Sequence, residues 1–150
     1  MKARRLEPGW RDGWWAGARH APSPNFGPRP AGERPSLVVL HSISLPPGVL
    51  RGDAVERLFL NALNVDRHAS LKGLRGLQVS AHFFVRRSGE VVQFVATHER
   101  AWHAGVSRWR GRDNCNDWSI GIEIEGLEGR TFVAAQYRAL QRLLQAVVSR

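Results

Sequence analysis

The sequence predicts a single α/β domain, and three features of the chain lead to this prediction. Residues 36–44 contain an unbroken apolar run that ends in a histidine, and prolines at 35 and 46 leave too little room for a helix there. Residues 79–87 and 118–126 alternate in the manner of half-buried strands, and residues 54–63 and 132–150 carry apolar side chains at helical spacing. The apolar run is typical of a strand covered on both faces, so we expect it in the middle of a sheet.

The composition is that of a soluble globular protein, with 150 residues, 43% of them hydrophobic and 23% charged. The net charge of +9 favours anionic partners, but the basic residues are not interleaved with aromatics, so an arginine-rich surface is favoured over a nucleic-acid site. No apolar stretch is long enough to span a membrane, and the basic N-terminus lacks the apolar core of a signal peptide. With Cys115 as the only cysteine, these features predict a protein of the reducing cytoplasm, and we expect a monomer.

The first 35 residues form an arm that is rich in proline, glycine and tryptophan. Its prolines and glycines break any long regular element. Trp10, Trp14 and Trp15 argue against a free tail, because burying each aromatic side chain stabilises the fold by about 2 kcal/mol or more. We therefore expect the arm to pack on the domain.

The middle of the chain predicts a helix and a β-hairpin. Asp53 is a candidate N-cap for a helix over residues 54–63, with Glu56 completing a capping box, and residues 64–77 should form a loop with a short helical turn. Residues 79–87 and 90–95 flank Ser88-Gly89, which predicts a tight turn between antiparallel strands.

The C-terminal third predicts a long loop, a strand and a helix. Residues 96–117 lack a regular pattern, and loops of this length inside a compact domain are usually functional. In the strand over residues 118–126, three isoleucines face one side, and Glu123 and Glu125 face the other at roughly 7 Å from each other. A last helix, capped by Thr131, should run from Phe132 to the end of the sequence.

Several of these residues could carry chemistry. A carboxylate over a central sheet must lie in a wet cleft or be paired, so Glu123 is a candidate general base; a solvent-exposed edge strand is the alternative. The six histidines include no His-x-x-x-His pair, and a zinc site, which needs three protein ligands, would have to be gathered from distant elements. His82 and His103 are candidate ligands by position, although a structural role is favoured for each. Trp102, on the long loop, is either an aromatic wall for a ligand or an anchor to the core.

The chain closely resembles the AmpD-type N-acetyl-anhydromuramyl-L-alanine amidases, which are zinc-dependent. The matching pieces occur in one order over nearly the whole chain: Pro22-Ser23-Pro24, Pro35-Ser36-Leu37, Val39-Leu40-His41-Ser42-Ile43-Ser44-Leu45-Pro46-Pro47-Gly48, Val79-Ser80-Ala81-His82, Gly89-Glu90-Val91-Val92-Gln93, Arg100-Ala101-Trp102-His103-Ala104-Gly105-Val106-Ser107, Cys115-Asn116-Asp117 and Ser119-Ile120-Gly121-Ile122-Glu123-Ile124-Glu125-Gly126. The resemblance implies a mixed central sheet flanked by helices and cytoplasmic work on recycled fragments of the cell wall.

The resemblance also implies a role for four residues. His41 would be a zinc ligand. Glu123 would be the catalytic carboxylate that takes a proton from the attacking water and returns it to the leaving amine. Ser42 and Trp102 would line the groove for the sugar and the peptide. The substrate would be an anhydromuramyl peptide, cut at the amide bond to L-alanine.

Two departures from the family pattern accompany the resemblance. The family's second histidine ligand, its aspartate ligand and an oxyanion-stabilising lysine all lie beyond the last predicted helix. We therefore expect residues 1–150 to be an amidase domain whose C-terminal part is missing, and to hold little zinc unless His82 and His103 act as substitute ligands. Two substrate-binding arginines of the family fall at Gln78 and Asn114, where Arg75 or Arg112 could compensate.

Two other functions remain open. Without the remaining ligands, the chain could be a module that binds muropeptides without cutting them. The basic charge also leaves a nucleic-acid-binding domain as a third class, which a steep dependence of DNA affinity on salt would support.

Overall fold

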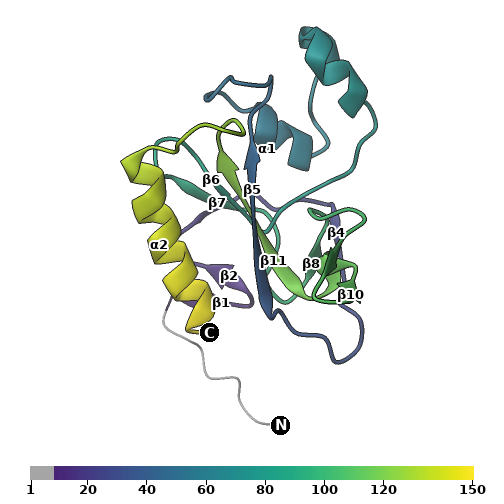
Figure 1. Cartoon of the computed structure of the whole chain (residues 1–150), viewed down its shortest axis with the longest axis vertical. Helices are drawn as coiled ribbons and strands as arrows, with labels where there is room; N and C mark the ends of the chain where they lie inside the picture. The colour runs from purple at the N-terminus through teal and green to yellow at the C-terminus, as the bar shows by residue number, and fades with distance from the viewer. Residues whose placement is uncertain (1–8) are drawn as a thin grey trace.

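The computed structural model describes residues 9–150, and a mixed five-stranded sheet forms the centre of the molecule (Figure 1). The strand order is β3-β7-β6-β11-β5. The β6–β7 pair is antiparallel, whereas the β3–β7, β6–β11 and β11–β5 pairs are parallel. The strands are β3 (Arg19–His20), β5 (Leu37–Ile43), β6 (Phe83–Val85), β7 (Val91–Gln93) and β11 (Ser119–Glu125). The predicted α/β class, mixed sheet and β-hairpin are therefore confirmed.

Each face of the sheet has its own hydrophobic core and its own helix. The long helix α2 (Ala134–Val148) lies along one face, where Ala139 and Leu143 pack against the three isoleucines of β11. The short helix α1 (Ala54–Phe59) belongs to the other face, where Phe59 meets Phe94 edge to face with ring centroids 5.1 Å apart. The alternation of β11 therefore directs its isoleucines toward α2 and its glutamates toward the opposite face.

The sequence predicted that the apolar run at residues 36–44 forms a central strand, and this prediction is wrong. Among the described residues β5 lies at the edge of the sheet and pairs only with β11, and the side chain of Leu40 is 48% exposed. The error has a physical cause. An unbroken apolar run indicates two apolar surroundings, but it does not say whether a neighbouring strand supplies them.

The N-terminal arm wraps the domain as predicted. Its strands β1 (Trp10–Arg11) and β2 (Trp14–Trp15) form a hairpin, with Trp10 buried in the core on the α2 face. Farther along, β3 joins the main sheet, and β4 (Phe26–Gly27) pairs with β8 (Arg100–Ala101). The side chain of Asn25 is buried and donates hydrogen bonds to Asn61 Oδ1 and to the Val79 carbonyl, both at 2.8 Å. Residues 1–8 lie outside the described part of the chain.

Arg29 ties the end of the arm to the loop that precedes β11. Its guanidinium group donates hydrogen bonds to the backbone carbonyls of Asp117 and Ser119, both at 2.9 Å, and of Asn116 and Thr97 at 3.2 and 3.1 Å. Burial lowers the pKa of Arg29 to about 10, so the group still carries its charge at neutral pH. The arm and the loop are thus held together by charge-assisted hydrogen bonds.

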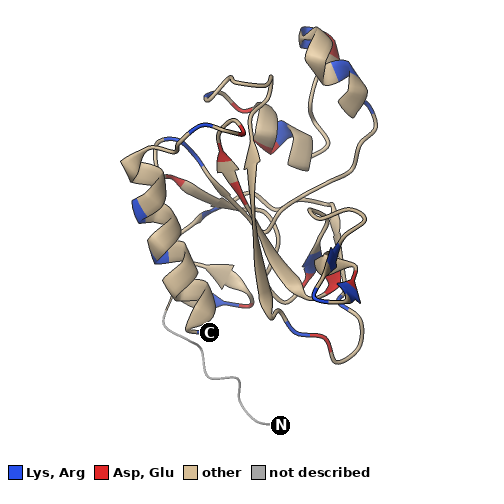
Figure 2. Ribbon diagram, in the orientation of Figure 1, with Lys and Arg blue, Asp and Glu red and all other residues tan. Residues whose placement is uncertain are grey.

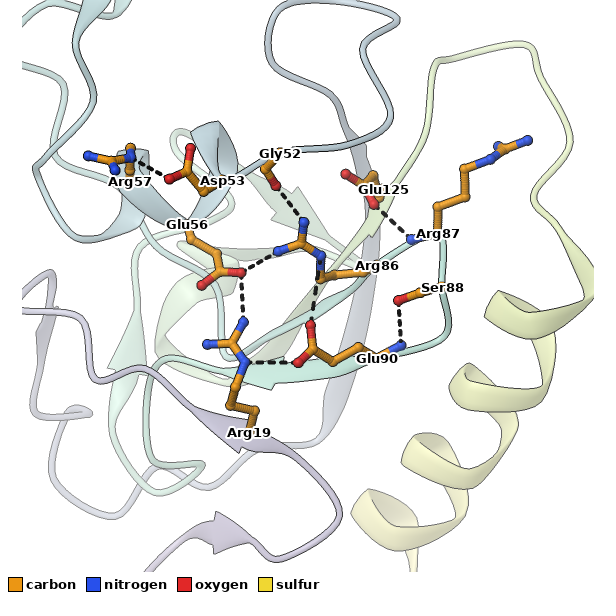
Figure 3. Close-up of polar contacts among 10 residues, drawn as sticks. All are labelled: Arg19, Gly52, Asp53, Glu56, Arg57, Arg86, Arg87, Ser88, Glu90 and Glu125. Carbon is orange, nitrogen blue, oxygen red and sulfur yellow. Dashed lines mark hydrogen bonds and ion pairs between the residues drawn. The ribbon is translucent and has the colours of Figure 1, made fainter.

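A network of ion pairs connects the arm to α1 and to the hairpin (Figure 3). Arg19 on β3 contacts Glu56 at 2.7 Å and Glu90 at 2.9 Å, and Arg86 also contacts Glu56. Arg19 is half-exposed, so each of its pairs contributes modestly, but the network joins segments that are distant in the sequence. Figure 2 shows the basic residues spread over α2, the hairpin near β10 and several loops.

The helix ends differ from the predictions in detail. Asp53 precedes α1 but makes no side-chain cap bond, because its Oδ2 accepts a hydrogen bond from Arg57 Nε at 2.6 Å instead. The predicted capping box is therefore wrong, and the helix ends at Phe59 rather than Leu63. The residue that precedes α2 is Val133 rather than Thr131, and Gln136 Oε1 accepts a hydrogen bond from its backbone N–H.

The two predicted loops contain short regular elements. Residues 64–77 include the 3-10 helices η1 (Val65–Arg67) and η2 (Ala69–Leu74). Residues 96–117 include β8, the hairpin of β9 (Arg108–Trp109) with β10 (Arg112–Asp113), and η3 (Cys115–Asp117). No helix within residues 9–150 combines the length and the apolar character that a membrane crossing needs.

Candidate functional site

His41 and Glu123 lie side by side on neighbouring parallel strands. In the register of β5 and β11, His41 is the direct partner of Glu123, and Gly121 is the partner of Val39. Paired residues of adjacent strands point to the same face, and strands lie about 4.8 Å apart. The structure therefore brings the predicted ligand and the predicted base together on the face opposite α2.

Glu123 is a carboxylate in a dry environment. Its Oε2 is buried and has no hydrogen-bond partner among the described residues. Burial raises the pKa of Glu123 to about 7, because desolvation disfavours the charged form. A carboxylate with a pKa near the working pH can both accept and return a proton, which is what general acid–base catalysis requires.

His103 comes from the long loop and contacts His41 directly. The two rings lie at 71° to each other, and His41 Nε2 is 2.9 Å from His103 Nδ1. Burial lowers the pKa of both rings, that of His103 to about 3, so both are neutral at pH 7. The ring of His103 lies against the backbone of Gly121, where an added Cβ would be 2.3 Å from Cγ of His103.

The backbone of this loop is fixed by Asn116. The Oδ1 atom of Asn116 accepts hydrogen bonds from the backbone N–H groups of His103, at 3.0 Å, and Ala104, at 2.8 Å. Sequence reasoning named His103 only as a possible substitute ligand. The useful signal was the glycine at position 121 between two isoleucines, because a glycine inside a strand often marks a close approach by another group.

His82, the other suggested substitute ligand, packs edge to face against His103, with ring centroids 6.1 Å apart, but its ring nitrogens bind other groups. It is fully buried, its Nδ1 accepts a hydrogen bond from the Gly121 N–H at 3.1 Å, and its Nε2 is 3.0 Å from the Glu99 carbonyl. Because a carbonyl can only accept, Nε2 carries the proton and both ring nitrogens are engaged. Both ring nitrogens of His82 are therefore taken up by the protein, in keeping with the structural role that the sequence favoured for it.

Ser42 and Trp102, the two residues predicted to line the substrate groove, differ in their position relative to His41 and Glu123. Ser42 is partnered with Ile124 in the strand register, so its exposed side chain is on the α2 face, away from His41 and Glu123. Trp102 directly precedes His103 and is half-buried, and its backbone N–H donates to Ser80 Oγ at 3.0 Å. The strand register therefore places the Ser42 side chain away from the pair, whereas Trp102 is adjacent in sequence to His103, which contacts His41.

The two arginines named as compensating residues both have acidic partners. Arg75, which directly follows η2, contacts Asp66 at 2.6 Å. Arg112 contacts Glu33 at 3.0 Å and lies over the ring of Trp118, with Cζ 4.3 Å from the ring centroid. That Arg75 or Arg112 compensates for the family's substrate-binding arginines therefore stays a prediction.

An apolar cleft of about 410 Å³ opens beside His41. It lies between the edge strand β5 and the loop with the β9–β10 hairpin, and its lining comprises Leu37, Val38, Val39, Leu40, His41, Ala104, Ser107, Arg108, Trp109 and Cys115. A cleft of this size can hold part of a small ligand, and its lining includes Arg108, which pairs with Asp113 at 3.6 Å.

The residues of this site fit a zinc ion in part. None of residues 9–150 forms a hydrogen bond with Nδ1 of His41, and the ring is neutral, as a zinc ligand must be. Within the same residues, however, no group of three His, Cys, Asp or Glu side chains could hold a metal. Residues 9–150 thus supply one candidate ligand of the three that a catalytic zinc needs.

This arrangement of fold and site defines a class of hydrolase. The family model of the N-acetylmuramoyl-L-alanine amidases (Amidase_2) matches residues 31–150, and the chain belongs to this family. Within the family it is similar to the 1,6-anhydro-N-acetylmuramyl-L-alanine amidases AmpD. It is 47% identical to that of Citrobacter freundii over 139 residues, which cover 93% of this chain and 74% of the relative. It is 46% identical to that of Escherichia coli K12, covering 91% and 74%.

Solved structures show the same fold. The crystal structure of a selenomethionine AmpD derivative matches with a TM-score of 0.90 at 46% identity, covering 93% of this chain and 78% of that one. AmpDh3 from Pseudomonas aeruginosa, in complex with an anhydromuramic pentapeptide, matches with a TM-score of 0.53 at 29% identity, covering 80% and 47%. The predicted family and fold are therefore confirmed.

Proposed function

We propose that this protein hydrolyses the amide bond between anhydro-N-acetylmuramic acid and L-alanine in peptidoglycan fragments, and that it does so in the cytoplasm during recycling of the cell wall. The observation that carries the proposal is Glu123, a buried carboxylate with a pKa near 7 beside the neutral ring of His41. Family membership and the AmpD relatives supply the reaction class.

In this reaction Glu123 acts as the proton carrier. The ionised carboxylate accepts a proton from the water that attacks the carbonyl carbon, and the protonated form then donates to the nitrogen of L-alanine as the C–N bond breaks. A pKa of about 7 suits both steps. General acid–base catalysis of this kind contributes about 10²- to 10⁴-fold to the rate.

His41 is the proposed ligand for zinc, through its unengaged Nδ1. When bound, a zinc ion supplies a Lewis acid that polarises the carbonyl and acidifies water. Trp102 is proposed to form a wall of the substrate groove, as an aromatic ring does against the apolar face of a sugar. Ser42 is left out of this groove because its side chain lies on the other face of the sheet.

The proposal is tested by hydrolysis of an anhydromuramyl-L-alanyl peptide in the presence of Zn²⁺. Two proteins are compared: the 150-residue chain, and a chimera that carries after α2 the C-terminal segment of the Citrobacter freundii relative that follows its region of similarity to this chain, to complete a three-ligand site. We expect the chimera to release the peptide with a free L-alanine amine, and Glu123→Gln in the chimera to slow release by about 10²- to 10⁴-fold.

A module that binds muropeptides without cutting them is the alternative, and the incomplete ligand set among residues 9–150 is the observation that favours it. Calorimetry of the same chimera with the same peptide separates the two functions. Binding without release of the amine would contradict the amidase and support the binding module.

A further inference from the structure

A chain of hydrogen bonds leads from His41 into the core of the protein. His41 Nε2 lies 2.9 Å from His103 Nδ1, and His103 Nε2 lies 3.1 Å from Ser119 Oγ. Ser119 Oγ in turn lies 2.5 Å from the carbonyl oxygen of Cys115. The imidazole nitrogens and the serine hydroxyl can each donate or accept a hydrogen bond. The carbonyl of Cys115 at the end of the chain of bonds can only accept.

The fixed acceptor at the end sets the direction of every bond. Ser119 has one hydroxyl proton, and that proton must point to the Cys115 carbonyl. Ser119 Oγ therefore accepts from His103, so the proton of His103 is on Nε2 and its Nδ1 has a lone pair. His103 Nδ1 then accepts from His41, so the proton of His41 is on Nε2.

We infer that His103 and Ser119 are positioning residues that hold the ring of His41 and fix its tautomer, leaving the lone pair on Nδ1. Metal-binding histidines usually donate their other ring N–H to a fixed acceptor, which sets both the ring orientation and the tautomer. Here the acceptor is a second histidine, and its own tautomer is set by a serine one step deeper in the core.

Two further observations support this assignment. Ser119 is fully buried, so water does not compete for its hydroxyl proton. His103 has little freedom to turn away, because its ring lies against Gly121 and its backbone N–H is bound to Asn116.

The tautomer of His41 is a property of the metal-free protein. That this tautomer serves to hold zinc rests on the proposed function. The relay also explains the glycine at position 121. Any side chain there would occupy the position of the His103 ring, which must come within hydrogen-bond distance of both His41 and Ser119.

The test is nitrogen NMR of the 150-residue chain with ¹⁵N-labelled histidine rings, in EDTA at pH 7.5. Long-range proton–nitrogen correlations report which ring nitrogen carries the proton. We expect His41 and His103 both to carry it on Nε2. In Ser119→Ala and in His103→Phe, the ratio of the Nε2–H to the Nδ1–H tautomer of His41 should fall by about five- to tenfold, as expected for the loss of one hydrogen bond.

The matched control is His103→Asn, because its side-chain oxygen can take the place of Nδ1 and accept from His41. It should keep His41 in the Nε2–H form, whereas a purely structural role of His103 would not distinguish Asn from Phe. A proton on Nδ1 of His41 in the unsubstituted chain, or an unchanged tautomer ratio in both His103→Phe and Ser119→Ala, would overturn the inference. Failure of the chimera to cleave its substrate would instead count against the proposed function alone.

Discussion

Replacing the buried acid Glu123 with glutamine is expected to stabilise the metal-free fold at neutral and alkaline pH. The carboxyl gains a proton more readily in the folded chain than in the unfolded chain, because burial raises its pKa from 4.5 to about 7. Since each tenfold change in a proton-binding constant is worth about 1.4 kcal/mol, the ionised group costs the folded state about 3 kcal/mol. Glutamine has nearly the same size and no charge to desolvate.

The pH dependence of this effect has a definite sign. Below pH 4.5 the carboxyl is protonated in both states, so Glu123→Gln should change stability little. As the pH rises from 4.5 to about 7, the unfolded chain ionises first and the original protein loses stability relative to the variant. Above about pH 7 the difference should level off at about 3 kcal/mol in favour of the variant.

Urea unfolding in EDTA at several pH values between 4 and 8.5 measures this difference. Glu125→Gln is the matched control, because Glu125 lies two residues along the same face and its Oε2 accepts a hydrogen bond from the Arg87 N–H at 2.7 Å (Figure 3). That substitution should destabilise the fold by about 1 kcal/mol, since it weakens a charge-assisted hydrogen bond. If Glu123→Gln were no more stable than the original chain at pH 8, Glu123 would not be a desolvated carboxylate and the reasoning would fail.

Three further substitutions test the surroundings of the site. Gly121→Ala should displace His103 and destabilise the fold by about 1–3 kcal/mol in thermal unfolding, with Gly73→Ala, where a Cβ meets nothing within 4 Å, as the control. Arg29→Met should cost about 3 kcal/mol in urea unfolding, because it removes donors from four backbone carbonyls; a loss below 1 kcal/mol would contradict that role. Trp102→Ala in the chimera should raise KM about tenfold and leave kcat within about threefold, whereas an equal fall in kcat would point to a role in the chemical step.

Local patterns in the sequence predicted much of the fold. The alternation in β11 separated the isoleucines, which pack toward α2, from Glu123, which faces His41. Proline and glycine marked the arm and the turn of the hairpin. The edge position of β5 was not predictable from its apolar run, because periodicity reports the polarity of the surroundings and not the identity of the neighbouring strands.

The site was only partly predictable for a related reason. The two residues that the structure places side by side had both been named from the sequence, His41 by resemblance and Glu123 by both resemblance and pattern. The contact of His103 with His41 depends on how a long loop folds back over Gly121, and no local pattern in the sequence encodes that path. His82 could not be excluded without the structure, because its engagement by Gly121 and Glu99 is a tertiary feature.

The position of β5 also has a consequence for biosynthesis. Among the described strands its only partner is β11, which leaves the ribosome long after β5 does. Contacts between segments so distant in sequence form late, because the loop between them must first be closed. A nascent chain would therefore carry His41 on an unpaired, apolar segment until β11 has been synthesised, and chaperones that bind extended apolar peptides should recognise it during that interval.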